Sequence, residues 1–156
     1  MLNESKKAFT MVELVFVIVV IGILSAVAIP KFAVNRDDAE IAKAKSEVAS
    51  IRSAVSVERQ KRILRGDFTP ITSLGTDTGY DKPIFDGING DAATPVFEYG
   101  LQSCKSASAQ GCWYTDDNTT YTYKFPVVGT VDFNLSSSSR FDCKVPTSAT
   151  CKELTQ

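Results

Sequence analysis

Hydrophobic residues follow two different patterns in the first part of this chain. From Phe9 to Ile29 almost every position is apolar or glycine. After Pro30 the apolar positions recur at the spacing of one helix face, with polar residues between them. This stripe consists of Ile41, Ala44, Val48, Ile51 and Val55. The first pattern predicts a helix that is apolar on all sides, and the second predicts an amphipathic helix.

Both patterns are expected to belong to one long helix, from about Phe9 to Arg65. Gly66 follows several basic residues, and a glycine just beyond a basic last turn is typical of a helix end. Such a helix is far longer than the ~11–12 residues that are usual in globular proteins. We therefore expect residues 9–30 to face lipid or sister helices, and residues 31–65 to form the amphipathic half of a helical spine.

The apolar run is long enough to cross a membrane. At ~1.5 Å per residue, a helix from Phe9 to Ile29 would be about 31 Å long, and the hydrocarbon core of a bilayer is roughly 30 Å thick. Lys6 and Lys7 precede the run on its short side. Because basic residues favour the cytoplasmic side, we expect the N-terminus in the cytoplasm and the chain after Pro30 across the membrane.

The segment Lys6–Pro30, KKAFTMVELVFVIVVIGILSAVAIP, resembles the N-terminus of prepilins, the precursors of type IV pilins and of type II secretion pseudopilins. In that family a prepilin peptidase removes a short basic leader, and the new N-terminus is methylated. The resemblance implies a leader of residues 1–8, cleavage between Ala8 and Phe9, and N-methylation of Phe9. Ala8 departs from the family, which usually has Gly before the cut. The matching positions are Phe9, Thr10, Glu13, Leu14, Gly22, Ile23, Leu24 and Ile29-Pro30.

Glu13 is the unusual residue of the apolar run. A carboxylate inside a membrane helix costs about 2.5–3.5 kcal/mol unless it is paired or lies near the interface. One explanation is that Glu13 lies within a turn of the interface and reaches the headgroups. The other is a partner, because cleavage after Ala8 would create a free amine on Phe9 that could meet the Glu13 of a neighbouring subunit. The resemblance implies this second role, in which the glutamate guides subunit docking.

The composition changes after the helix, and residues 66–156 are predicted to form a β-rich head. Residues 67–92 contain several turn dipeptides and read as a connecting loop. Tyr121, Tyr123 and Phe125 alternate with polar residues, which places three aromatic side chains on one face of a strand. Asp116–Asn118 is expected to be a hairpin turn. The strand candidates are Val96–Leu101, Cys112–Thr115, Thr120–Phe125, Val127–Leu135 and Phe141–Val145.

The predicted fold class is α+β. An antiparallel sheet of these strands would have one apolar face, and the apolar stripe of the helix is its obvious partner. The expected architecture is therefore type IV pilin-like, with a long N-terminal helix, membrane-spanning in its first half, packed on a small antiparallel head.

Four cysteines are present, and their spacings fit neither a zinc site nor a redox CxxC motif. On the oxidising side of the membrane they are expected to form two disulfides. Three pairings can be drawn, and local spacing favours Cys104 with Cys112 and Cys143 with Cys151.

From the other residues of the sequence we expect no cofactor, no metal site and no enzymatic activity. The chain has no histidine, so an acid–base pair is not evident. The acidic turns Asp77–Asp81 and Asp86–Asp91 could collect calcium, but neither has a full EF-hand pattern, and ordinary turn chemistry explains them. The sequence pI of about 5.5 argues against a nucleic-acid partner. The one basic patch lies at the helix end and comprises Arg59, Lys61, Arg62 and Arg65.

The leading hypothesis is a structural subunit of a type IV pilus-like filament, made as a single-pass inner-membrane precursor with a periplasmic head. The alternative is a pseudopilin of a type II secretion system, and a minor pilin that binds DNA or a surface is a weaker hypothesis. The expected partners are like subunits in a homopolymer, the prepilin peptidase, the pilus or secretion assembly platform, and the membrane.

Overall fold

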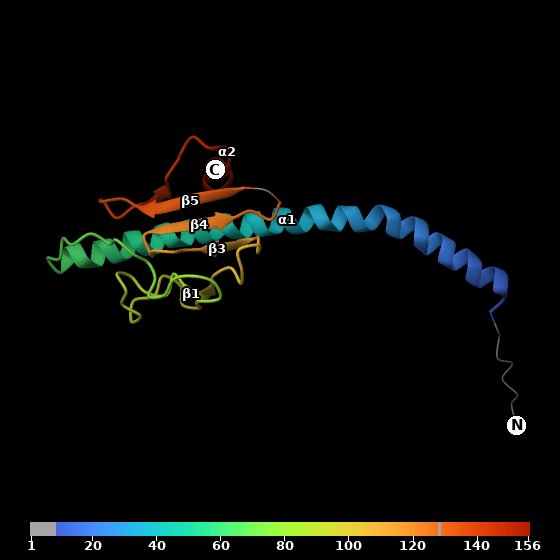
Figure 1. Ribbon diagram of the computed structural model, residues 1–156, viewed down its shortest axis with the longest axis horizontal. Helices are drawn as coiled ribbons and strands as arrows, with labels where there is room; N and C mark the ends of the chain where they lie inside the picture. The colour runs from blue at the N-terminus through green and yellow to red at the C-terminus, as the bar shows by residue number, and fades with distance from the viewer. Residues whose placement is uncertain (1–8, 128) are drawn as a thin grey trace, which may run out of the picture. The chain divides into compact units, whose positions relative to one another are not determined.

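The computed structural model describes residues 9–127 and 129–156, apart from the side chains of residues 27 and 29–35 (Figure 1). The predicted leader, residues 1–8 with Ala8, lies outside the described residues. The chain divides into two compact units, residues 1–36 and residues 37–156. The boundary follows Arg36, a few residues beyond the predicted boundary at residue 30.

The long helix is α1 (Met11–Leu64), and it ends as the sequence predicts. Gly66 has a φ of 79°, a left-handed conformation that glycine adopts without steric cost. Its N–H donates to the carbonyl of Ile63 at 3.0 Å, and the N–H of Asp67 donates to the carbonyl of Arg62 at 2.9 Å. These two bonds form a Schellman motif, which satisfies carbonyl groups that the last turn would otherwise leave unpaired.

A four-stranded antiparallel sheet dominates the second unit. Its strands are β3 (Cys112–Tyr114), β4 (Thr120–Lys124), β5 (Thr130–Leu135) and β6 (Phe141–Cys143), and each pairs with the next in chain order. In Figure 1 these strands run alongside the part of α1 that belongs to the same unit. The structure confirms the α+β class and the antiparallel head.

The core of this unit lies between α1 and the sheet. Ala44, Val48, Ile51 and Val55 are each at most 1% exposed, and Ile41, the first residue of the predicted stripe, is partly buried against the same core. On β4 the side chains of Tyr121 and Tyr123 are buried, and the three other residues of the strand are partly exposed. This pattern confirms the predicted alternation. Both elements contribute to one hydrophobic cluster.

The β3–β4 hairpin turns where the sequence predicts. Asn118 takes a positive φ of 56°. The Asp117 carboxylate accepts hydrogen bonds from the backbone N–H groups of Thr119 at 2.9 Å and Thr120 at 2.7 Å. The side chain of Asp117 therefore caps the turn, as Asp commonly does.

Three elements differ from the prediction. The predicted loop 67–92 contains a short strand, β1 (Pro83–Ile84), which pairs with β2 (Leu101–Gln102). The predicted strand Val96–Leu101 is wrong except at Leu101, because its apolar residues Val96 and Phe97 pack against the core without joining a ladder. The C-terminal helix α2 (Ala149–Thr155) was not predicted, because its seven residues are too few to show a helical period.

The segment before β1 is held to the sheet by buried hydrogen bonds. The Tyr121 hydroxyl accepts from the backbone N–H of Leu74 at 2.8 Å and donates to the carbonyl of Asn118 at 2.7 Å. The hydroxyl of Ser139 accepts from the N–H of Ile71 at 2.8 Å. Burial raises the pKa of the Tyr121 phenol, so the hydroxyl stays neutral and keeps its proton to donate.

Both disulfides have the pairing that local spacing favours. Cys104 is bonded to Cys112, and Cys143 is bonded to Cys151. The first disulfide joins the segment just after β2 to β3, and the second joins β6 to α2. Each closes a short loop that would otherwise be free in the unfolded chain.

We predict that Tyr121→Phe lowers the free energy of unfolding by about 1–3 kcal/mol. The change leaves the Leu74 N–H and the Asn118 carbonyl without their buried partner. Urea denaturation of the purified chain would measure the loss. Tyr99→Phe is the matched control because Tyr99 is 83% exposed, and an equal loss in both variants would contradict the explanation.

We also predict that replacing either cysteine pair with serine lowers the free energy of unfolding by about 2–3 kcal/mol in the chain-entropy model. Thermal denaturation of the Cys104→Ser/Cys112→Ser and Cys143→Ser/Cys151→Ser variants would measure this. Reduction should lower the stability of wild type but not that of a variant lacking all four thiols. Free thiols in the oxidised wild type would contradict the assignment.

Candidate functional site

The start of α1 is built as a capping box. The carbonyl of Thr10 accepts the first helical hydrogen bond, from the N–H of Leu14 at 3.1 Å, so Thr10 is the N-cap. Its hydroxyl accepts from the N–H of Glu13 at 3.2 Å, and the Glu13 carboxylate accepts from the N–H of Thr10 at 3.3 Å. The two side chains therefore satisfy N–H groups that a helix start leaves unpaired.

Sequence reasoning identified Glu13 but missed this cap. The signal was present, because Thr10-Met11-Val12-Glu13 matches the Ser/Thr-x-x-Glu pattern of a capping box. The carboxylate also lies in the first turn, where the helix dipole favours a negative charge. Glu13 thus has a structural role within its own chain, in addition to any role between chains.

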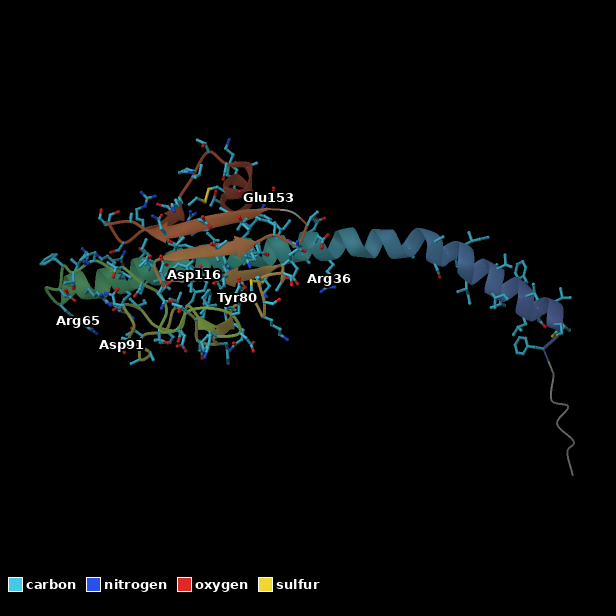
Figure 2. All side chains as sticks on the ribbon, viewed as in Figure 1. Arg36, Arg65, Tyr80, Asp91, Asp116 and Glu153 are labelled. Atoms are coloured by element: carbon cyan, nitrogen blue, oxygen red, sulfur yellow. A yellow bond between two sulfur atoms is a disulfide. The ribbon has the colours of Figure 1, made fainter. Side chains whose placement is uncertain are left out.

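The first turns of α1 expose apolar side chains in every direction. Figure 2 shows these side chains projecting outward from the helix. Phe9, Met11 and Val12 are 81%, 82% and 79% exposed, and each large hydrophobic residue from Leu14 to Leu24 is exposed as well. Among the described residues, no helix combines the length and the apolar character that crossing a membrane requires.

Of the predicted processing residues, Phe9 is described and Ala8 lies outside the described residues. Phe9 directly precedes the N-cap and is almost fully solvent-exposed. A chain that began at Phe9 would therefore keep Thr10 and Glu13, and with them the whole capping box.

The acidic turns of the head use their side chains to hold the loop. The Asp86 carboxylate accepts hydrogen bonds from the backbone N–H and the hydroxyl of Thr76. The Asp91 carboxylate accepts from the N–H of Ala93 at 2.9 Å. In the part of the chain that the structure describes, no three His, Cys, Asp or Glu side chains gather where they could hold a metal ion.

The basic patch at the end of α1 is largely engaged locally. Glu58 pairs with Arg62 at 3.2 Å and with Lys61 at 3.9 Å. Arg59 instead donates to the carbonyl of Thr69 at 2.7 Å, beyond the helix end. Nearby, hydrogen bonds from Thr69 lower the pKa of Asp67. Two residues of the patch are therefore paired within the helix, and Arg59 ties the helix to the chain that follows.

Comparison with known proteins finds a family match at the start of the chain and several similar proteins. Residues 5–29 match the family described as the prokaryotic N-terminal methylation motif. A fimbrial protein of Pseudomonas aeruginosa is 33% identical over 78 residues, which are 50% of this chain and 48% of that protein. The type IV narrow pilus major component PilA5 of Thermus thermophilus is 45% identical over 51 residues, which are 33% of this chain and 44% of that protein.

A secretion protein is similar over a comparable stretch. The type II secretion system core protein G of Klebsiella michiganensis is 30% identical over 83 residues, which are 53% of this chain and 56% of that protein. The chain spans about half the length of these relatives. No solved structure matches it. Residues 5–29 thus match the prokaryotic N-terminal methylation motif, and over a third to a half of its length the chain is similar to a fimbrial protein, a type IV pilus component and a type II secretion system core protein.

Proposed function

We propose that this chain is a structural, non-enzymatic subunit of a type IV pilus-like filament. It would be made as an inner-membrane precursor, cut between Ala8 and Phe9, methylated at Phe9 and polymerised through the start of α1. The observation that carries this proposal is the apolar surface from Phe9 to Leu24, which is exposed all around the helix. The match of residues 5–29 to the N-terminal methylation motif and the similarity of the chain to a fimbrial protein support it.

A helix that is apolar on all sides is stable only when something covers it. Before assembly, lipid would cover residues 9–30 in the inner membrane. After assembly, the equivalent helices of like subunits would replace the lipid. The unit of residues 37–156 has its own core and both disulfides, so it would stay folded through this exchange.

Glu13 would have a second partner in the filament. In the single chain its carboxylate accepts hydrogen bonds from Thr10. A carboxylate has room for further donors, because its two oxygens can accept about four hydrogen bonds. Cleavage would give Phe9 a positively charged amine, and the Phe9 amine of one subunit would pair with the Glu13 of its neighbour. Two groups that are costly in lipid would become a compensated pair.

A pseudopilin of a type II secretion system is the second candidate, because core protein G of such systems is also a relative. Both functions would use the same helix and the same leader cleavage. They differ in where the filament ends: a pilus extends from the cell, whereas a pseudopilus stays in the periplasm.

The first test of this proposal is processing. We predict that the mature chain begins at Phe9 and carries one N-terminal methyl group. Mass spectrometry of the protein from cell envelopes would measure both. Ala8→Gly should be cut at least as well as wild type, because Gly is the residue the family has before the cut. An N-terminus at Met1, or after Ala26 or Ala28, would overturn the assigned cleavage site.

The second test separates the two roles of Glu13. Glu13→Gln keeps a side chain that can complete a capping box but removes the charge. Thr10→Ala removes the N-cap, at about 0.5–2 kcal/mol of helix stability, but keeps the charge. We predict normal processing in both variants, with greatly reduced filament yield only in Glu13→Gln.

Sheared filaments should be quantified against membrane-bound subunit in the two strains and in wild type. If Thr10→Ala lost filaments as strongly as Glu13→Gln, the cap would explain the requirement and the charge pair would be wrong. Wild-type yield in Glu13→Gln would also refute the charge pair.

A further inference from the structure

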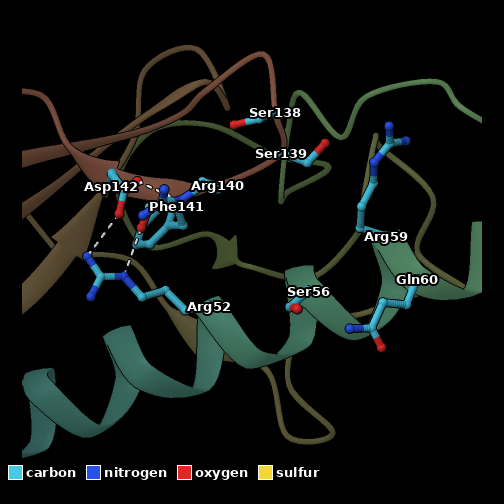
Figure 3. Close-up of a pocket in the computed structure, with 9 residues that line it drawn as sticks. All are labelled: Arg52, Ser56, Arg59, Gln60, Ser138, Ser139, Arg140, Phe141 and Asp142. Atoms are coloured by element: carbon cyan, nitrogen blue, oxygen red, sulfur yellow. Dashed lines mark hydrogen bonds and ion pairs between the residues drawn. The ribbon is translucent and has the colours of Figure 1, made fainter. Parts of the chain in front are cut away.

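A groove in the unit of residues 37–156 is lined by three arginines, two of them on α1. It lies between the helix and the β5–β6 turn with β6, and its volume is about 430 Å³ (Figure 3). Ser56 lies on the helix side of the groove, and Ser138 and Ser139 lie across from it. The volume is in the range of small-molecule pockets. The arginines that line it are Arg52, Arg59 and Arg140.

The charges of the groove do not balance. Asp142 is the one acidic residue in the lining. Its carboxylate is shared between Arg52 at 3.2 Å and Arg140 at 3.3 Å. Arg59 donates to a neutral partner, the Thr69 carbonyl. The lining therefore holds three guanidinium groups and one carboxylate, although the chain as a whole carries a formal net charge of −1. Outside the lining, hydrogen bonds from Thr69 and, to a smaller extent, the charge of Arg59 lower the pKa of Asp67.

Part of this positive charge is held in a fixed position. Arg52 donates through Nε to the carbonyl of Phe141 at 2.9 Å and through a terminal nitrogen to Asp142. These two bonds orient the guanidinium plane and leave further N–H groups for a ligand, because a guanidinium has five. Fixing the donors beforehand reduces the entropy lost when a ligand binds.

The other lining groups are neutral hydrogen-bonding groups. Ser56, Gln60 and Ser138 bring two hydroxyls and an amide to the groove. The hydroxyl of the nearly buried Ser139 accepts from Ile71, which leaves its own proton for an acceptor in the groove. Such groups suit the hydroxyls of a sugar, and the arginines suit an oxyanion, since the guanidinium fork matches carboxylate and phosphate oxygens.

We propose that this groove binds an acidic sugar, with the carboxylate or phosphate of the sugar held by the arginines of the lining and its hydroxyls held by the serines and Gln60. All the residues of the site lie in one unit of one chain, so it needs no residue from a second subunit. It would give the head a ligand that neither the methylation motif nor the helix predicts.

Isothermal titration of the full chain in detergent, at low salt, would test the site with four probes. Glucuronate carries a carboxylate, glucose 6-phosphate carries a phosphate, glucose carries hydroxyls alone, and inorganic phosphate carries the anion alone. We expect saturable binding of glucuronate or glucose 6-phosphate that is tighter than that of glucose and of inorganic phosphate. The tighter of the two acidic sugars identifies the anion. Binding should weaken as salt is added.

Two variants locate the binding. Arg140→Gln removes a side chain that is 74% exposed, and Arg59→Gln removes the arginine that has no acidic partner in the groove. Each should weaken binding by about tenfold or more, as expected for a lost charge-assisted hydrogen bond. Arg65→Gln removes the same charge outside the groove and should bind like wild type.

The proposal would be overturned if neither acidic sugar bound saturably, or if glucose bound as tightly as the acidic sugars. It would also be overturned if inorganic phosphate bound as tightly as they do, which would mean an adventitious ion only. Wild-type affinity in both Arg140→Gln and Arg59→Gln would overturn it as well. Near-ultraviolet circular dichroism of each variant would verify that the aromatic core is intact.

Discussion

The burial of one helix face under the aromatic face of the sheet is the interaction on which the head depends. The helix contributes small and β-branched side chains to this core, from Ala44, Val48, Ile51 and Val55, and the strands contribute large aromatic side chains. Trp113 adds a polar link, because its indole N–H donates to Glu47 of α1 at 2.7 Å. The hydrophobic contact supplies most of the stabilisation, and the single hydrogen bond helps to fix which strand lies over which turn.

The same helix uses the opposite arrangement at its start. There the apolar residues are not gathered on one face, and Phe9 and Leu24 are both largely exposed. An amphipathic face can be satisfied within one chain, whereas an apolar surface on all sides needs lipid or other chains. One continuous helix thus combines a segment that is buried within its own chain with a segment whose apolar surface needs a cover from outside the chain.

The loops of the head are ordered by specific polar contacts more than by secondary structure. Tyr121 and Ser139 accept hydrogen bonds from backbone N–H groups of the chain that follows α1. The two disulfides tie the segment just after β2 and the helix α2 to the sheet. Phe85 adopts a positive φ of 59° and is fully buried. A bulky residue rarely adopts that conformation, so the packing around its ring must offset the strain.

The sequence by itself determined the features that depend on local period and local chemistry. The apolar run, the stripe, the Gly66 stop, the alternation of β4 and the hairpin at Asp117 are all encoded in neighbouring residues. The tertiary structure decided what depends on residues far apart in the chain. Examples are the pairing of β1 with β2, the irregular path of Val96 and the helix α2. They follow from core contacts and a disulfide, which the spacing of apolar residues along the sequence does not reveal. The arginine groove is of the same kind, because Arg52 and Asp142 come together only when the helix packs against the last strand.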